Sequence, residues 1–86
     1  MNIQFTASAW ADFCELIDTD KRLTKAIRNK LRDIARDPAG MLQTAEPLKY
    51  DFSGWYSIKL DREHRLVFQL HEEVLLVLSC RYHYQR

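Results

Sequence analysis

The sequence predicts an α+β fold in which two N-terminal helices pack on one face of a mainly antiparallel sheet of four or five strands. Apolar residues recur at three- and four-residue spacing between residues 10 and 36, which is typical of amphipathic helices. After residue 55 they alternate with a period of two, and short polar turns separate the alternating runs, as in a strand meander. Helices that precede such a meander cover one side of its sheet.

Length and charge limit the class of protein. The chain has 86 residues, and we expect one domain over residues 1–86. Its net charge of +1, from 13 basic and 12 acidic residues, is not that of a histone-like binder, so any nucleic-acid affinity must come from local clustering. The start of the chain does not resemble a signal peptide, and no apolar run reaches membrane-spanning length. We therefore expect a cytoplasmic protein with no membrane partner.

The first twenty residues predict a strand followed by a helix. Residues 1–5 alternate between apolar and polar, and Thr6 or Ser8 offers an N-cap. Asp18–Asp20 then interrupts the helix and offers a second N-cap. The shared apolar face of this helix is formed by Trp10, Phe13, Cys14 and Ile17.

A second helix is predicted from Lys21 to Arg36, and it carries two stripes. The apolar stripe consists of Leu23, Ile27, Leu31 and Ile34. The basic stripe, on nearly the opposite side, consists of Lys21, Lys25, Arg28, Arg32 and Arg36. A charged stripe is ordinarily the solvated face of an amphipathic helix, but five cations without an acid also fit a highly anionic partner such as RNA. Asp37–Gly40 should end the helix, and Met41–Ala45 is expected to be a flexible loop.

The remaining strands are predicted over residues 56–60, 65–70 and 74–82, with turns at 61–63 and 71–73. Both faces of Val74–Leu78 are apolar, which favours an interior strand. The alternation assigns one set of side chains to the face beneath the helices: Ile58, Leu60, Leu66, Phe68, Leu70, Leu76 and Leu78. The opposite parity assigns four others to the open face of the sheet: Lys59, Arg65, Arg81 and His83.

The open face is the candidate site. Glu46 and Lys49 lie in the segment that enters the sheet. A positive sheet face can hold phosphates, and Trp55, Tyr82 or Tyr84 could stack on bases. The alternative is that these cations are simply solvated, because one sheet face meets water.

Other kinds of site find little support in the sequence. Cys14 and Cys80 are expected to be reduced, mostly buried thiols, and His64 and His71 to be surface or structural residues. The scattered histidines predict no metal site, and no glycine-rich phosphate loop or nucleophile triad is present.

Four motifs resemble one known family. They are Glu46-Pro47-Leu48-Lys49, Ser53-Gly54-Trp55-Tyr56-Ser57, Glu63-His64-Arg65-Leu66-Val67 and Arg81-Tyr82-His83-Tyr84. Together with Trp10 and Asp20-Lys21-Arg22 they are similar to the YoeB/Txe family of bacterial toxins, within the RelE superfamily. The resemblance spans nearly the whole chain and implies a RelE-like fold, also described as microbial RNase-like.

The resemblance also implies a function. Members of this family are metal-independent endoribonucleases that need no cofactor, enter the ribosomal A site and cleave the mRNA there. The implied partners are the ribosome with its mRNA and a YefM/Axe-like antitoxin, through which the toxin would reach operator DNA. A homodimer is a further possibility. The sequence does not specify the codon preference or the antitoxin.

Residue roles follow from the same resemblance. It implies that Glu46 is the general base, His83 the general acid and Arg65 the main phosphate clamp, supported by Lys49 and Tyr84. The family often has Arg where this chain has Lys59, and a lysine loses the planar fork of an arginine. The chain also continues past the usual terminal tyrosine with Gln85-Arg86.

Two other functions stay open on the sequence. One is a non-catalytic module that binds RNA or protein through the same basic face. The other is a relative that acts on a different target, such as a topoisomerase inhibitor. Glu46 and His83 discriminate against the binding module, because a pure binder needs no acid and base beside its cations. The set of Glu46, Arg65 and His83 argues against the relative with a different target.

Overall fold

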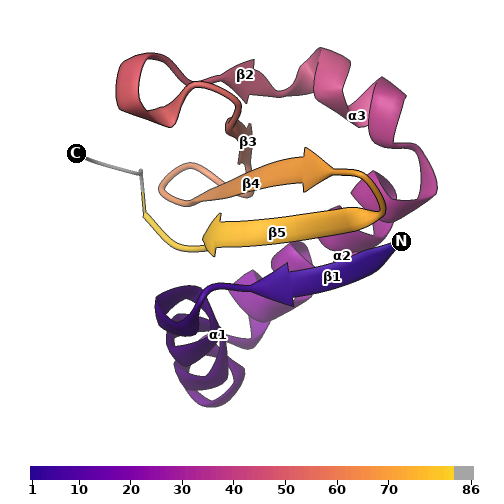
Figure 1. Cartoon of the computed structure of the whole chain (residues 1–86). Helices are drawn as coiled ribbons and strands as arrows, with labels where there is room; N and C mark the ends of the chain where they lie inside the picture. The colour runs from indigo at the N-terminus through magenta and orange to yellow at the C-terminus, as the bar shows by residue number, and fades with distance from the viewer. Residues whose placement is uncertain (83–86) are drawn as a thin grey trace.

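The computed structural model describes residues 1–82, in which helices and strands follow in the order β-α-α-α-β-β-β-β (Figure 1). Within these residues the elements are β1 (Asn2–Phe5), α1 (Ala7–Thr19), α2 (Lys21–Arg36), α3 (Pro38–Thr44), β2 (Glu46–Pro47), the 3-10 helix η1 (Tyr50–Phe52), β3 (Tyr56–Lys59), β4 (Arg65–His71) and β5 (Val74–Ser79). No helix in this part of the chain is both long and apolar enough to cross a membrane.

The strands form one mixed sheet in the order β1-β5-β4-β3-β2. Neighbouring strands from β2 to β5 are antiparallel, and β1 pairs with β5 in parallel. Strand β5 lies between β1 and β4, which confirms the interior position predicted from its two apolar faces. The predicted α+β class and the mainly antiparallel sheet are likewise confirmed.

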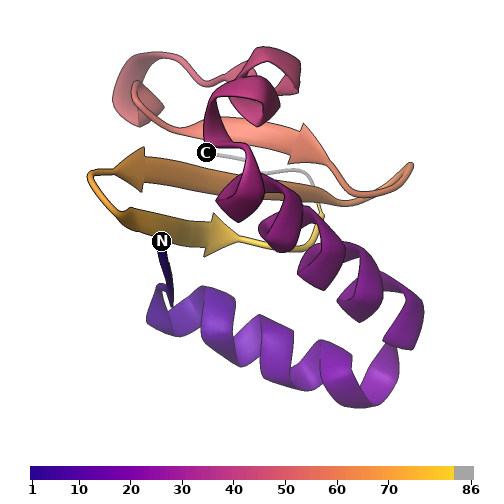
Figure 2. The same ribbon diagram turned by 90° about the vertical axis from the view of Figure 1, so that its right-hand side faces the viewer.

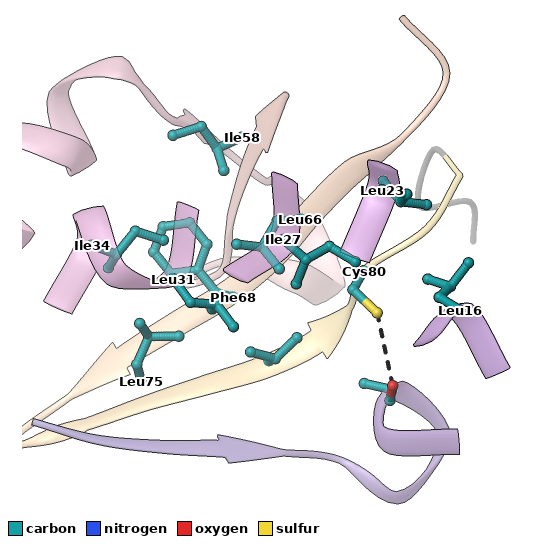
Figure 3. Packing of buried hydrophobic residues seen from close by; sticks show 12 residues of the cluster. Leu16, Leu23, Ile27, Leu31, Ile34, Ile58, Leu66, Phe68, Leu75 and Cys80 are labelled. Carbon is teal, nitrogen blue, oxygen red and sulfur yellow. Dashed lines mark hydrogen bonds between the residues drawn. The ribbon is translucent and has the colours of Figure 1, made fainter. Parts of the chain in front are cut away.

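The helices lie on one side of the sheet, where α2 crosses the strands diagonally and α1 lies beside β1 (Figures 1 and 2). All four residues of the apolar stripe on α2 are buried. They pack against side chains from β3, β4 and β5, namely Ile58, Leu66, Phe68, Leu75 and Val77, and Figure 3 labels the first four of these. The other face of the sheet is not covered by α1 or α2, and this is the open face.

Helix boundaries are set by side-chain caps. Thr6 accepts a hydrogen bond from the backbone N–H of Ala9, and Asp20 accepts one from that of Leu23. Both caps were predicted from the sequence. The flexible loop predicted at Met41–Ala45 is wrong, because α3 occupies Pro38–Thr44. Its N-cap is Asp37, and proline suits the first turn of a helix, where its missing N–H is not needed.

Two predicted apolar faces are corrected. On α1 the fully buried residues are Ala9 and Leu16, whereas Trp10 and Ile17 are 53% and 45% exposed. Cys14, on the same face, is exposed, which contradicts the buried thiol that was expected there; the prediction for Cys80 is confirmed.

On β5 the core face carries Leu75 and Val77 instead of Leu76 and Leu78. The register places Phe68 opposite Val77 and Leu70 opposite Leu75, and directly paired residues share a face. A bulge next to Val67 then shifts the register, so Cys80 also reaches the core.

Candidate functional site

Pairing across three strands brings the predicted polar residues to the open face. Glu46 on β2 lies opposite Ser57 on β3, and Lys59 on β3 lies opposite Arg65 on β4. Ile58, between Ser57 and Lys59, is in the core, so its two neighbours point the other way. The alternation therefore placed Lys59 and Arg65 correctly.

A carboxylate and a guanidinium meet on this face. Nη2 of Arg65 lies 3.2 Å from Oε1 of Glu46, which is 19 residues earlier in the chain. Nε of Arg65 donates to Oγ of Ser57 at 2.7 Å. Ser57 is buried, the Arg65 side chain is 20% exposed and that of Glu46 is 68% exposed. The serine thus orients a partly covered guanidinium, while the carboxylate stays accessible to solvent.

Lys59 adds a second positive charge beside Arg65. Like charges directly across an antiparallel pair repel, and an anion bound between them removes that repulsion. Lys49 is exposed at the start of η1, three residues after Glu46. Trp55 is half-buried and directly precedes β3, and its carbonyl oxygen accepts a hydrogen bond from the backbone N–H of Leu48. Lys59 lies beside Arg65 on the sheet and Lys49 follows Glu46 in the chain, and two further cations suit phosphate binding better than binding of a neutral ligand.

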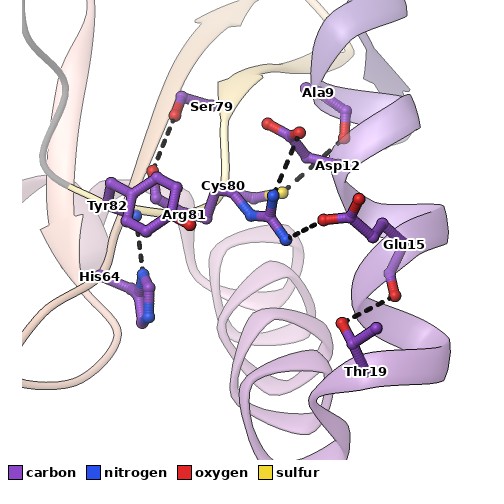
Figure 4. Close-up of polar contacts among 9 residues, drawn as sticks. All are labelled: Ala9, Asp12, Glu15, Thr19, His64, Ser79, Cys80, Arg81 and Tyr82. Atoms are coloured by element: carbon purple, nitrogen blue, oxygen red, sulfur yellow. Dashed lines mark hydrogen bonds and ion pairs between the residues drawn. The ribbon is translucent and has the colours of Figure 1, made fainter.

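Arg81 does not belong to this face, which corrects the prediction. Its guanidinium points at α1, where Nη2 lies 2.7 Å from Oε1 of Glu15 and Nη1 lies 3.6 Å from Oδ1 of Asp12 (Figure 4). The hydrogen bond with Glu15, with help from both acidic charges, raises the pKa of Arg81 although burial opposes this. Strand β5 ends at Ser79, so the alternation could not be extended to residue 81.

A contact between His64 and Tyr82 was not predicted from the sequence. The backbone N–H of Tyr82 donates to Nδ1 of His64 at 2.7 Å, and the two rings lie 5.3 Å apart (Figure 4). Only 12% of the His64 side chain is exposed. The residues are 18 positions apart, and no periodic signal could have paired them. Tyr82 is 54% exposed, and its ring also lies under the guanidinium of Arg81.

The remaining candidate residues are at the end of the chain and on α2. His83 and Tyr84, and also Gln85 and Arg86, lie outside the described residues. All five residues of the basic stripe on α2 are exposed, and Arg36 pairs with Asp33 at 3.1 Å. Within residues 1–82 no group of three His, Cys, Asp or Glu side chains is arranged to hold a metal ion.

Comparison with solved structures defines the class of protein first. The fold matches a YoeB/ParE toxin from Agrobacterium tumefaciens with a TM-score of 0.88 and 35% identity, covering 98% of this chain and 100% of the other. It also matches the toxin in a YoeB–YefM complex from Staphylococcus aureus, with a TM-score of 0.86 and 33% identity over 98% of each chain. A YoeB dimer from the same organism is equally similar, with a TM-score of 0.86. These are toxins of the RelE superfamily.

The family follows from the sequence comparisons. Residues 5–84 match the family described as the YoeB-like toxin of bacterial type II toxin–antitoxin systems. Toxin YoeB of Synechocystis sp. is 43% identical over 86 residues, which is the full length of both chains. The chain therefore belongs to the YoeB-like toxin family.

Proposed function

We propose that this toxin is a metal-independent endoribonuclease that cleaves mRNA in the ribosomal A site and so stops translation. The RNA supplies its own nucleophile, the 2′-hydroxyl, which attacks the adjacent phosphorus. The products are a 2′,3′-cyclic phosphate and a 5′-hydroxyl. The protein must take the 2′ proton, stabilise the charged phosphorane and protonate the leaving 5′ oxygen.

The observation that carries this proposal is the Glu46–Arg65–Ser57 arrangement. Arg65 is held through Nε by Ser57. Its Nη2 atom, now engaged by Glu46 at 3.2 Å, is therefore directed at the site where a phosphate would lie. A bound phosphate would draw Arg65 from Glu46, leaving the exposed carboxylate to accept the 2′ proton. Lys59 would add positive charge to the same anion, since it lies opposite Arg65.

The remaining roles are assigned by resemblance. His83 would protonate the 5′ oxygen, because the ordinary pKa of histidine lies near neutrality. Lys49 and Tyr84 would support the phosphate and orient the substrate. A lysine at position 59 binds phosphate as a point charge without a bidentate fork, so we expect it to contribute less than Arg65.

The test is primer extension on an mRNA translated in a reconstituted system. The parent toxin should produce cuts within codons, and Arg65→Ala should lower the cleavage rate about 10²–10³-fold because one preorganised charge-stabilising donor is lost. Glu46→Gln should lower it about 10²–10⁴-fold, since its amide cannot accept the proton. His71→Ala, at the exposed end of β4, is the matched control and should cleave like the parent. Uncut mRNA with ribosome binding intact would favour the non-catalytic RNA-binding module.

We further propose that a YefM-like antitoxin neutralises this toxin and joins it in repressing their operon. The YoeB–YefM complex of Staphylococcus aureus supports such a partner, and the dimer from that organism supports self-association. Ribosomal RNA would dock on the basic stripe of α2, because all five of its cations are exposed.

A further inference from the structure

Hydrogen bonds hold the backbone of Tyr82, which immediately precedes the last four residues of the chain. The backbone N–H of Tyr82 donates to Nδ1 of His64 at 2.7 Å, and its carbonyl accepts from the backbone N–H of Arg65 at 3.1 Å. The φ angle of Tyr82 is 60°, a left-handed conformation that is unfavourable for a residue with a side chain. Such a conformation persists where the surroundings impose it, and here two consecutive residues bind both backbone groups of Tyr82.

His64 is itself rigidly held. Its backbone N–H donates to Oδ1 of Asp61 at 2.7 Å, and its carbonyl accepts from the backbone N–H of Leu60 at 2.9 Å. Its ring is largely covered and contacts the Tyr82 ring. The turn between β3 and β4 therefore presents the imidazole in a fixed orientation, unlike His71, whose side chain is 80% exposed.

The geometry also fixes the position of the imidazole proton. A backbone N–H can only donate, so Nδ1 of His64 must be the acceptor and must carry no proton. The ring proton then resides on Nε2, which lies 3.8 Å from Oε1 of Glu63. A residue without an acceptor at this position would leave the Tyr82 N–H unpaired.

We propose that His64 is a positioning residue for the cleavage reaction, a role that rests on the proposed function. Residues 64 and 65 are adjacent, and the first holds Tyr82 while the second is the phosphate clamp. Tyr82 precedes His83 and Tyr84, the expected acid and its neighbour. One peptide bond and one hydrogen bond thus link the clamp to the start of the segment that carries the acid. Arg81, paired with Glu15 and Asp12, ties the same segment to α1.

Two substitutions separate the contribution of the Nδ1 acceptor of His64 from that of its ring. His64→Asn retains a side-chain acceptor near Nδ1 but removes the ring, whereas His64→Phe retains a ring against Tyr82 but removes the acceptor. We expect His64→Phe to lower kcat for mRNA cleavage by up to about 100-fold with little change in KM, because a misplaced group loses rate without losing substrate binding. His64→Asn should recover most of that loss, and His71→Phe, the matched control, should behave like the parent. Equal kcat values for His64→Phe and His64→Asn would overturn the proposal.

Two further measurements do not depend on activity. Long-range proton–nitrogen NMR of the parent toxin should find the imidazole proton of His64 on Nε2. Amide exchange at Tyr82 should be slow in the parent and in His64→Asn, and fast in His64→Phe. A proton on Nδ1, or equal exchange in all three proteins, would refute the contact itself. A parent toxin that fails to cleave mRNA would end the proposed function and the positioning role with it, while these two measurements would still decide whether His64 holds Tyr82.

Discussion

The two thiols of this protein differ in exposure, since Cys80 is buried and Cys14 is not. Burial raises the pKa of Cys80 to about 11, the charge of Asp12 adds to the effect, and Arg81 opposes it. The Cys80 Sγ–H also donates to the carbonyl oxygen of Ala9 at 3.8 Å. Cys14 is exposed on α1. The thiolate is the reactive form, so burial and the raised pKa both protect Cys80.

We predict that iodoacetamide modifies Cys14 alone in the folded toxin and reaches Cys80 only after denaturation. Peptide mass spectrometry at successive times measures this, and Cys14→Ser should leave the folded protein unlabelled. Equal labelling of both thiols in the folded state would contradict the burial of Cys80.

The raised pKa of Cys80 also predicts how the stability of the protein depends on pH. The stabilisation is complete below the ordinary thiol pKa of 9.0. It declines as the pH rises towards about 11, because in this range only the unfolded chain releases the thiol proton.

Single residues could be placed from the sequence where the strand alternation is unbroken. Lys59 and Arg65 were assigned to the open face because Ile58 and Leu66 beside them are apolar, and the structure buries both of these neighbours. Arg81 was misplaced, since alternation ends with the strand and its carboxylate partners are on α1. The Tyr82–His64 contact escaped prediction for a similar reason, because a backbone donor leaves no trace in the sequence.

At the scale of elements, the Asp37 cap of α3 requires a glycine at position 40, although glycine has a low helix propensity. Oδ1 of Asp37 accepts from the backbone N–H of Gly40 at 3.2 Å. A Cβ added at Gly40 would collide with the Asp37 carboxyl group. In most helix interiors Gly→Ala stabilises by about 1 kcal/mol, but here the added methyl group displaces the cap.

We predict that Gly40→Ala has different effects on stability in two backgrounds. In the parent it should fail to stabilise the protein, because the gain in propensity is offset by a lost cap worth about 0.5–2 kcal/mol. In an Asp37→Ala background it should raise the free energy of unfolding by up to about 1 kcal/mol. Urea unfolding of the four proteins in this double-mutant cycle gives the coupling. An equal gain in both backgrounds would show that the Asp37 cap contributes nothing.

Elements were predicted well where a cap and a periodicity agreed. Thr6 and Asp20 begin α1 and α2 as expected, and the stripe on α2 is buried as expected. The helix α3 was missed because Asp37 and Pro38 were interpreted as a stop signal, although the same pair also suits a start. The core face of β5 was assigned wrongly because both of its faces are apolar, and only pairing with β4 reveals the bulge.

At the scale of the whole molecule, the sheet separates two basic surfaces. Helix α2, which carries the basic stripe, covers one face of the sheet (Figure 2), and the register places the Glu46–Arg65 pair on the other face. The fold class and the placement of the basic stripe and Arg65 on opposite sides of the sheet followed from periodicity. Glu46 was expected near this face only because its segment leads into the sheet, and its role came from the family resemblance, since strand β2 has two residues and carries no periodic signal.

This separation predicts that ribosome docking and mRNA cleavage can be lost independently. The double charge reversal Arg28→Glu with Arg32→Glu should weaken cosedimentation with ribosomes and reduce its salt dependence, because fewer counterions are released on binding. Neither arginine forms an ion pair within residues 1–82, so the fold should persist, as circular dichroism would verify. Arg65→Ala should cosediment normally and fail to cleave.

The matched control reverses the same amount of charge outside the five residues of the stripe. Arg22→Glu with Arg62→Glu changes two exposed arginines, one in the first turn of α2 and one in the turn between β3 and β4, and both line one pocket with Asp61 and Glu63. If net charge alone governed association, this pair would weaken cosedimentation as much as the stripe variant does, and the docking role of α2 would be wrong. If the stripe is the docking surface, the control should retain most of the parent's affinity at every salt concentration. The difference between the two variants is therefore the quantity to measure, because both carry the same net charge.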